Sequence, residues 1–156
     1  MKETLHYEIV INSPVKKVWD TMLGDATYRE WTSIFYPGSY FKGDWGEGSK
    51  ILFLGPNPNG QGEGGMSSRI KTNRKHDFIS IEHLGVVSNG KEDTTSDEVK
   101  KWTPIFENYT FTKKGEETLL VVDMEMPSTS EAKAMAEMFK GIWPQSLLKL
   151  KEICER

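Results

Sequence analysis

The sequence predicts an α+β fold in which a curved antiparallel sheet of about six or seven strands wraps around one long C-terminal helix. Short alternating segments separated by turn residues fill positions 40–126, which is typical of antiparallel strands. The last segment, from residue 130 onward, holds apolar residues at helical spacing. Helical patterns lie at the two ends of the chain and do not alternate with strands. This order favours segregated helices over a parallel α/β fold.

The composition is that of one globular domain. A chain of 156 residues suits a single core, and we expect residues 1–156 to form one domain. A net charge of −3 gives no attraction to nucleic acid. One cysteine, Cys154, excludes an internal disulfide, and no apolar run approaches the ~20 residues that a membrane span requires. The N-terminus lacks the apolar segment of a secretion signal, so a cytoplasmic location is expected.

The first elements are a strand and two short helices. Residues 4–12 alternate between apolar and polar side chains, which predicts a half-buried strand. Ser13 and Pro14 are suited to the N-cap and first position of a helix that Gly24 ends. Asp25 can cap the second helix. The inward face of the first helix is marked by Val15, Val18, Trp19 and Met22.

Strands and turns make up the middle of the chain. Alternation predicts strands within residues 50–55, 65–73 and 77–87, followed by a clear hairpin over residues 105–127 that turns at Lys114–Glu116. Residues 88–102 are polar and charged and are expected to form an exposed loop.

The final helix carries a broad apolar stripe. Ser128 or Ser130 can cap it, and about 26 residues at ~1.5 Å each make it ~40 Å long. Pro144 removes one backbone hydrogen bond in its middle, which predicts a kink.

Three glycines, Gly60, Gly62 and Gly65, match the G-x-G-x-x-G pattern of dinucleotide-binding loops. Such a loop holds a pyrophosphate because a helix follows it and presents oriented N–H groups. Here residues 66–71 alternate like a strand. The pattern therefore indicates a hairpin connection and not a nucleotide site.

Five pieces of the chain follow one another in an informative order. They are "INSPVKKVW" at 11–19, "EWTSIF" at 30–35, "FKGDWGEGSKILF" at 41–53, the hairpin at 109–127 and "GIWPQSLLKLKEICE" at 141–155. This order resembles the START-like (SRPBCC) helix-grip superfamily, and the similarity is strongest to the branch named for the activator of heat-shock-protein-90 ATPase homologues. In the last piece, Ile142 is inserted between Gly141 and Trp143 relative to the family pattern. The resemblance implies the helix-grip, birch-pollen-allergen-like fold.

No catalytic or metal-binding set can be assembled from the sequence. The three histidines lack a second histidine or cysteine at metal-ligand spacing. Glu82 and His83 are neighbours in a strand, so one of them faces the interior. Arg69 is either exposed or the one cation that reaches a ligand.

Aromatic and methionine residues on the inward faces favour an apolar cavity between the sheet and the last helix. We expect a small-molecule binding protein that takes an apolar or amphipathic, lipid-like ligand and needs no cofactor or metal. The predicted ligand-binding residues are Tyr28, Trp31, Phe35, Met66, Arg69, Met124, Met135, Phe139 and Trp143.

Two other functions stay open. Relatives with this fold include cyclases and aromatase-like proteins, which implies an enzyme in which Glu82 or His83 acts as acid or base and Arg69 binds an anion. The family description also implies an interaction domain with a chaperone ATPase as partner.

Overall fold

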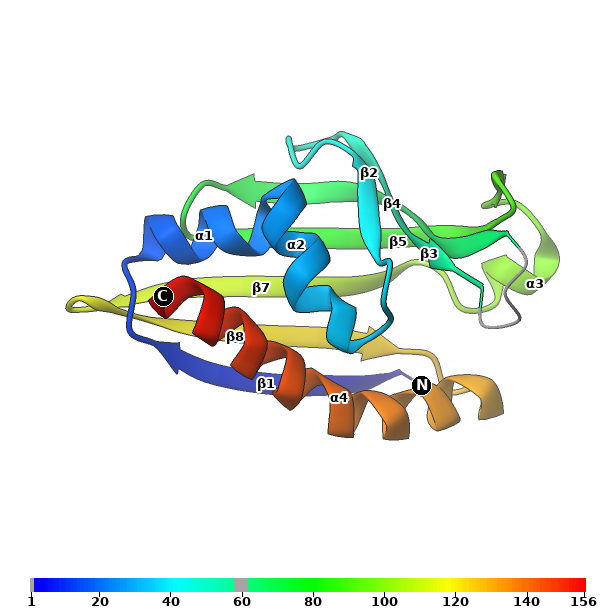
Figure 1. The fold of residues 1–156 in the computed structure, drawn as a ribbon. Helices are drawn as coiled ribbons and strands as arrows, with labels where there is room; N and C mark the ends of the chain where they lie inside the picture. The colour runs from blue at the N-terminus through cyan, green and yellow to red at the C-terminus, as the bar shows by residue number, and fades with distance from the viewer. Residues whose placement is uncertain (1, 58–61) are drawn as a thin grey trace.

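The computed structural model describes residues 2–57 and 62–156 and confirms the curved antiparallel sheet (Figure 1). Its order is β1-β8-β7-β5-β4-β3-β2, and β6 pairs with β5 outside this path. Every pairing is antiparallel. The strands are β1 (Glu3–Ile11), β2 (Tyr40–Gly43), β3 (Lys50–Pro56), β4 (Glu63–Arg74), β5 (Phe78–Ser88), β6 (Lys91–Asp93), β7 (Ile105–Lys114) and β8 (Glu117–Met126).

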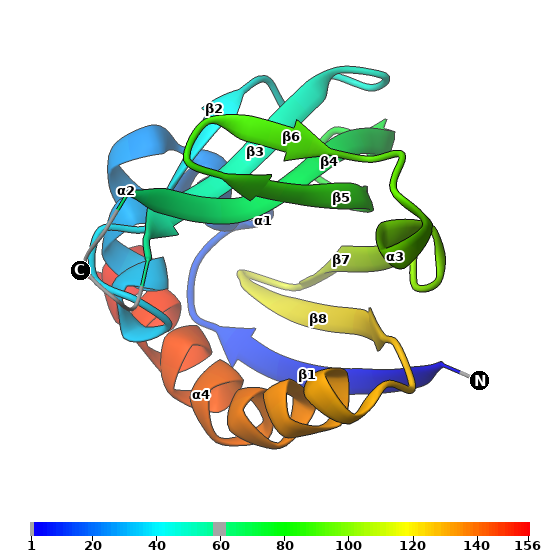
Figure 2. The ribbon, with the colours of Figure 1, turned by 90° about the vertical axis from the view of Figure 1, so that its right-hand side faces the viewer.

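The main helices lie on one side of the sheet. Figure 2 shows the sheet curling, with α1, α2 and α4 on its concave side. Among the described residues, no helix combines the length and apolar character that crossing a bilayer requires. The helices are α1 (Val15–Leu23), α2 (Asp25–Trp31), which continues into the 3₁₀ turn η1 (Thr32–Ile34), α3 (Asp97–Lys100) and α4 (Ser130–Glu155).

The sequence predicted an exposed loop for residues 88–102, but this stretch also contains regular structure. It contains β6 and the one-turn helix α3. The Ser96 hydroxyl caps α3 by accepting from the Val99 amide at 3.2 Å, and Val99 is buried. β6 pairs with β5 through its backbone, and such pairing needs no apolar alternation. The polar sequence therefore gave no apolar pattern from which β6 or α3 could be predicted.

The predicted helix caps differ from the observed ones by one residue. Pro14 occupies the N-cap position of α1, and Gly24 that of α2, so Asp25 is the first helical residue. Thr129 caps α4, because its hydroxyl accepts from the Ala132 amide at 3.1 Å.

α4 runs without interruption through Pro144. The proline at which a kink was expected does not break the helix, and Figure 2 shows the helix curving along the sheet. Next to the proline, the Gln145 side chain donates to the Gly141 carbonyl at 3.0 Å. The proline removes the backbone donor of the Lys140 carbonyl, four residues earlier, so this side-chain bond lies one position further along the helix.

The core consists of two clusters that α4 connects. The larger cluster joins α1, α2 and the sheet to the C-terminal half of α4, where Leu147, Leu150 and Ile153 are buried. The smaller cluster packs Ala132 and Ala136 of α4 against Leu5 of β1 and Met126 of β8. The small alanine side chains let the N-terminal half of the helix approach the sheet edge closely.

The glycine-rich stretch leads into a strand, as expected. β4 begins at Glu63, so no helix follows the described glycines. A Cβ atom at Gly65 would lie 1.8 Å from the Phe53 carbonyl oxygen, which explains glycine there as a close approach between strands. Gly60 lies outside the described residues.

Anchoring of α4 should depend on Leu150. Leu150→Ala removes a fully buried side chain, and we expect a loss of about 2–4 kcal/mol in the free energy of unfolding by urea. Leu148→Ala on the same helix is the control. Leu148 is largely exposed, so its loss should stay within about 0.5 kcal/mol. Equal losses would contradict this packing.

The exposed face of β1 and β8 carries a pH-dependent contact. His6 bonds to Glu8 at 3.0 Å and to Asp123 at 2.5 Å, and these two carboxylates raise the pKa of His6 above its ordinary value of 6.5. A raised folded-state pKa gives stabilisation that is complete below pH 6.5 and is lost as the pH rises through the folded value.

We therefore expect His6→Asn to lower the thermal midpoint more at pH 5.5 than at pH 9. Thermal unfolding of both proteins at the two pH values measures this difference. A gap between the proteins that is equal at both pH values, or larger at pH 9, would contradict the assignment.

Candidate functional site

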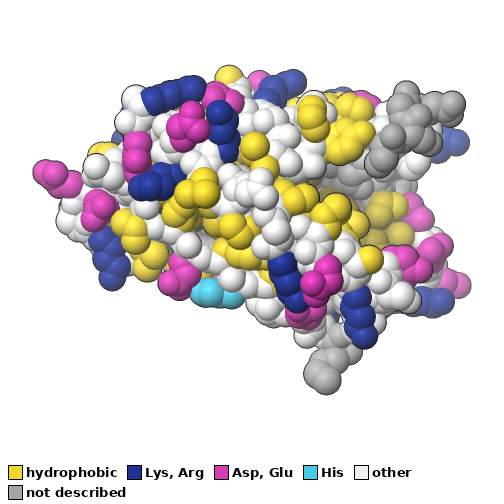
Figure 3. Space-filling view, turned by 60° about the horizontal axis from the view of Figure 1, so that its bottom comes forward, with side chains coloured by type: hydrophobic (Ala, Val, Ile, Leu, Met, Phe, Trp, Pro, Cys, Tyr) yellow, Lys and Arg dark blue, Asp and Glu magenta, His cyan; other side chains and the backbone are white. Residues whose placement is uncertain are grey.

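A pocket of about 470 Å³ lies between α4, α2 and the concave face of the sheet. Figure 3 shows a hollow on this side of the molecule with hydrophobic side chains inside it. The helical side of the wall is Tyr28, Trp31, Thr32, Phe35, Met135, Phe139 and Trp143, and the sheet contributes Phe53, Met66, His83, Ile105, Glu107, Tyr109, Met124, Glu125 and Met126, among others.

Eight of the nine residues that the sequence singled out lie in this wall. They are Tyr28, Trp31, Phe35, Met66, Met124, Met135, Phe139 and Trp143.

Arg69 lies elsewhere. It pairs with Glu82, opposite it on β5, at 2.6 Å, whereas the preceding residue Ser68 bonds to the pocket residue His83. Successive residues of a strand point to opposite faces, so Arg69 and Glu82 occupy the face away from the pocket.

Contacts between aromatic rings hold the helical side of the wall in place. The Phe35 ring lies edge-on to Trp143, with centroids 4.8 Å apart, and to Phe139 at 5.8 Å. Tyr28 meets Trp31 edge-on at 5.5 Å. Edge-to-face geometry is a favoured arrangement for aromatic pairs, so each ring restricts the rotamers of its neighbours. The wall is thereby kept from collapsing inward.

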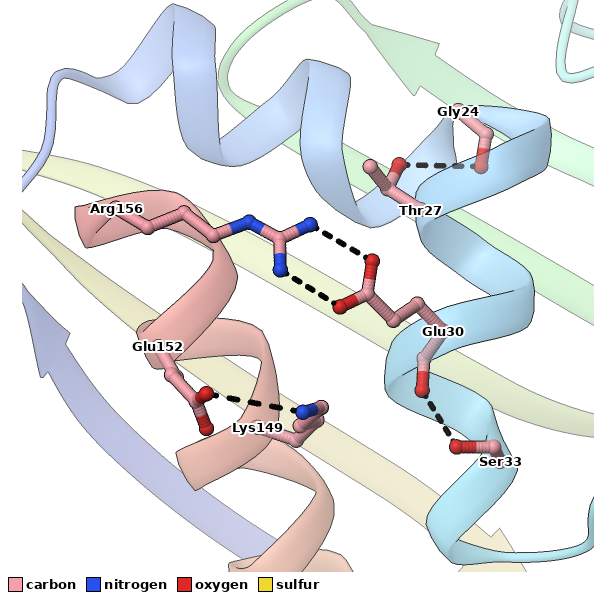
Figure 4. Close-up of polar contacts among 7 residues, drawn as sticks. All are labelled: Gly24, Thr27, Glu30, Ser33, Lys149, Glu152 and Arg156. Atoms are coloured by element: carbon pink, nitrogen blue, oxygen red, sulfur yellow. Dashed lines mark hydrogen bonds and ion pairs between the residues drawn. The ribbon is translucent and has the colours of Figure 1, made fainter.

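α2 and α4 are also joined outside the pocket. The Arg156 guanidinium forms two parallel bonds to Glu30, of 2.9 and 2.8 Å (Figure 4). Deeper inside, the Ser146 hydroxyl donates to the Trp31 carbonyl at 2.8 Å, and the Trp31 indole donates to Met22 of α1 at 3.0 Å. These contacts fix the position of Trp31 in the pocket wall.

The sheet side of the pocket contains a connected polar chain of Ser68, His83, Glu107 and Tyr109, all of them buried. Ser68 lies directly opposite His83 in the β4–β5 register and contacts its Nδ1 at 2.7 Å. His83 Nε2 contacts Glu107 Oε1 at 3.0 Å. The Tyr109 hydroxyl donates to Glu107 Oε2. We call these four residues the polar chain.

The charge of Glu107 affects two phenols. Burial raises the pKa of Tyr109 well above its usual value, and the nearby Glu107 raises it further. Burial also raises the pKa of Tyr28, with a second contribution from Glu107. Both phenols therefore stay protonated at neutral pH and can act as hydrogen-bond donors.

Sequence reasoning identified His83 as one of two alternatives but missed Glu107 and Tyr109. A signal was present, because Glu107 alternates in phase with Ile105, Tyr109 and Phe111. A carboxylate on the apolar face of a strand must find buried donors. Its partner His83 lies 24 positions away in sequence, and only the β5–β7 pairing reveals the contact.

Ser68, His83 and Glu107 are the residue types of a nucleophile, its base and an orienting carboxylate. The serine, however, is 1% exposed and does not line the pocket in which a substrate would bind, so its hydroxyl does not face a ligand bound there. The predicted enzymatic set is also divided, because His83 faces the pocket while Glu82 and Arg69 pair on the other face. No group of residues suited to hold a metal ion occurs within the described part of the chain.

Comparison with known proteins agrees with the resemblance seen in the sequence. A family model described as "Activator of Hsp90 ATPase homolog 1-like protein" matches residues 12–155, and the chain belongs to this family. No curated protein matches the chain.

Solved structures share the fold at low identity. Protein NE0264 from Nitrosomonas europaea is 16% identical with a TM-score of 0.72, covering 97% of this chain and 94% of that one. ChR145 from Cytophaga hutchinsonii is 21% identical with a TM-score of 0.68, covering 98% and 94%. CalU16 from Micromonospora echinospora is 17% identical with a TM-score of 0.65, covering 97% and 74%.

The polar chain should contribute to stability through Tyr109. Tyr109→Phe removes one donor from the buried Glu107, and we expect a loss of about 1–3 kcal/mol in the free energy of unfolding. Tyr40→Phe is the control, because Tyr40 also donates to a carboxylate, Glu63, at the surface. Its loss should stay below about 1 kcal/mol. Chemical denaturation measures both, and a smaller loss for Tyr109→Phe would contradict the buried chain.

Proposed function

We propose that this protein binds a small apolar or amphipathic molecule in the pocket between α4 and the sheet. The observation that carries the proposal is a pocket of about 470 Å³ with an aromatic and methionine wall and one polar chain. Ligand sites are typically ~300–1,000 Å³, largely apolar, with a few polar groups that orient the ligand. The helix-grip fold of the family supports the same reading.

The chemistry of the wall supports an uncharged or amphipathic ligand. None of the described wall residues is a lysine or arginine. Four methionines, Met66, Met124, Met126 and Met135, contribute to the wall. Methionine is flexible and polarisable, so it adapts to ligands of different outline.

Met135 marks a route of entry. It lies in the pocket wall and is 47% exposed, so the pocket reaches the surface beside the N-terminal half of α4. That half packs on the sheet edge through the small cluster of Ala132 and Ala136, with Phe139 beside them. A ligand can enter here without unfolding the larger core cluster.

The two other functions have weaker support. The predicted enzymatic set needs His83 or Glu82 together with Arg69 at one site, but only His83 lines the pocket, and Arg69 pairs with Glu82 on the other face. A chaperone partner rests on the family description alone. A cytoplasmic location stays a prediction from the sequence.

Binding of N-phenyl-1-naphthylamine, an uncharged apolar dye, tests the proposal. We expect saturable dye fluorescence with the folded protein. Met135→Glu places a charge at the pocket wall and should weaken dye binding at least about tenfold. Met138→Glu is the matched control, because Met138 is exposed on the same helix outside the wall. Absence of saturable dye binding, or an equal effect of both variants, would refute the proposal.

A further inference from the structure

The hydrogen atoms of the polar chain are directed to protein acceptors. A carboxylate only accepts hydrogen bonds, so His83 donates its Nε2–H to Glu107 and Tyr109 donates its O–H to the other oxygen. In the neutral tautomer that carries its proton on Nε2, His83 Nδ1 accepts from the Ser68 hydroxyl. The members of this chain that line the pocket therefore present lone pairs to it.

Three other hydroxyls of the wall, those of Thr32, Tyr36 and Ser39, also donate to protein acceptors. Thr32 donates to the Tyr28 carbonyl at 2.5 Å, and Ser39 donates to the Tyr36 carbonyl at 2.7 Å. Tyr36 donates to the Asn57 carbonyl at 3.3 Å. Each of these protons points into the protein, so these groups cannot donate to a ligand without losing an internal bond.

Glu107 has acceptor capacity to spare. Its two oxygens offer about four lone-pair sites, and the described residues use two of them. Tyr28 complements it, because no hydrogen bond from the Tyr28 hydroxyl is found within the described ranges and its side chain lies in the wall. The Phe53 ring lies 6.2 Å from Tyr28 and 5.9 Å from His83, the partner of Glu107, between ring centroids, so Tyr28 and Glu107 line the same side of the pocket.

We propose that the pocket selects ligands that carry a hydroxyl group, phenolic or alcoholic, which donates to the Glu107 carboxylate and can accept from Tyr28. This proposal rests on the proposed function, since it names the ligand class for the same pocket. An apolar body fills the aromatic and methionine wall, and the hydroxyl reaches the polar chain.

The same arrangement disfavours two related ligand classes. A methyl ether has no proton to give, so it cannot form the hydrogen bond to Glu107 that a hydroxyl group forms. A carboxylate ligand brings a second negative charge next to Glu107, and no lysine or arginine among the described wall residues compensates for it. Sites built to bond a hydroxyl reject analogues without one more strongly than they reject a small change in apolar size.

Three ligands with one tail test this selectivity on the unmodified protein. 4-Butylphenol, 4-butylanisole and 4-butylbenzoate displace bound N-phenyl-1-naphthylamine at pH 7.5, and their competition constants are compared. We expect the phenol to bind at least about tenfold more tightly than the anisole, as one hydrogen bond to a charged group predicts, and the benzoate to bind most weakly. Equal binding of phenol and anisole, or benzoate binding as tight as that of the phenol, would overturn the inference.

Glu107→Gln identifies the residue responsible. A neutral amide removes the charge, so the preference for phenol over benzoate should fall at least about tenfold while dye binding persists. Glu82→Gln is the matched control, because Glu82 is a buried carboxylate in the neighbouring strand on the opposite face, and it should keep the preference. An unchanged preference in Glu107→Gln would overturn the assignment to this residue.

The outcomes separate the two proposals. Dye that binds without discrimination among the three ligands refutes the hydroxyl selectivity and leaves the apolar pocket standing. Dye that does not bind refutes the pocket function itself. If Glu107→Gln does not fold, the ligand series on the unmodified protein still decides the question.

Discussion

The packing of α4 across the concave side of the sheet determines where every other feature of the molecule can lie. Beyond Trp143 the helix is held by large buried side chains, Leu147, Leu150 and Ile153. Near its start it is held by Ala132 and Ala136 against β1 and β8. Phe139 and Trp143, which pack on these clusters between the two anchors, also line the pocket, and Met135 lines it beside Ala136. A long helix that bridges a curved sheet meets it best at its ends, and the space in between becomes the site.

Burial of a carboxylate in this space imposes a second constraint. A buried charge lowers stability unless donors surround it, and Glu107 obtains donors from His83 and Tyr109. The three side chains come from two adjacent strands, β5 and β7, so the sheet positions them without any contribution from a loop. Such a rigid polar group inside an apolar wall orients a ligand more than it attracts one. The aromatic wall supplies the contact area, and the polar chain supplies the direction.

Sequence reasoning could predict the framework because its signals are local. Alternation marked the strands, and helical spacing marked α1, α2 and α4. Helical spacing put Phe139 on an inward face and strand alternation did the same for Met124, and both residues line the pocket. The short elements β6 and α3 escaped because backbone pairing and a serine cap hold them without an apolar pattern.

The polar part of the site could not be predicted in the same way. Whether Glu82 or His83 faces inward depends on the pairing of β5 with β4 and β7, and a register shift between Ser67 and Ser68 alters the count along that edge. The same pairing decides where Arg69 points. Ser68 lies opposite His83 and Arg69 lies opposite Glu82, and adjacent positions of a strand face opposite sides of the sheet. Glu107 acquires its role only through a partner that is distant in sequence.

The most direct test of the central claim uses the methionine methyl groups as reporters. In a protein with ¹³C-labelled methionine methyls, addition of N-phenyl-1-naphthylamine should shift the NMR signals of Met66, Met124, Met126 and Met135, which line the pocket. The signals of Met22, buried in the larger core cluster, and Met138, exposed on α4, should stay in place. Shifts confined to Met138, or no shifts at saturating dye, would contradict a ligand pocket between α4 and the sheet.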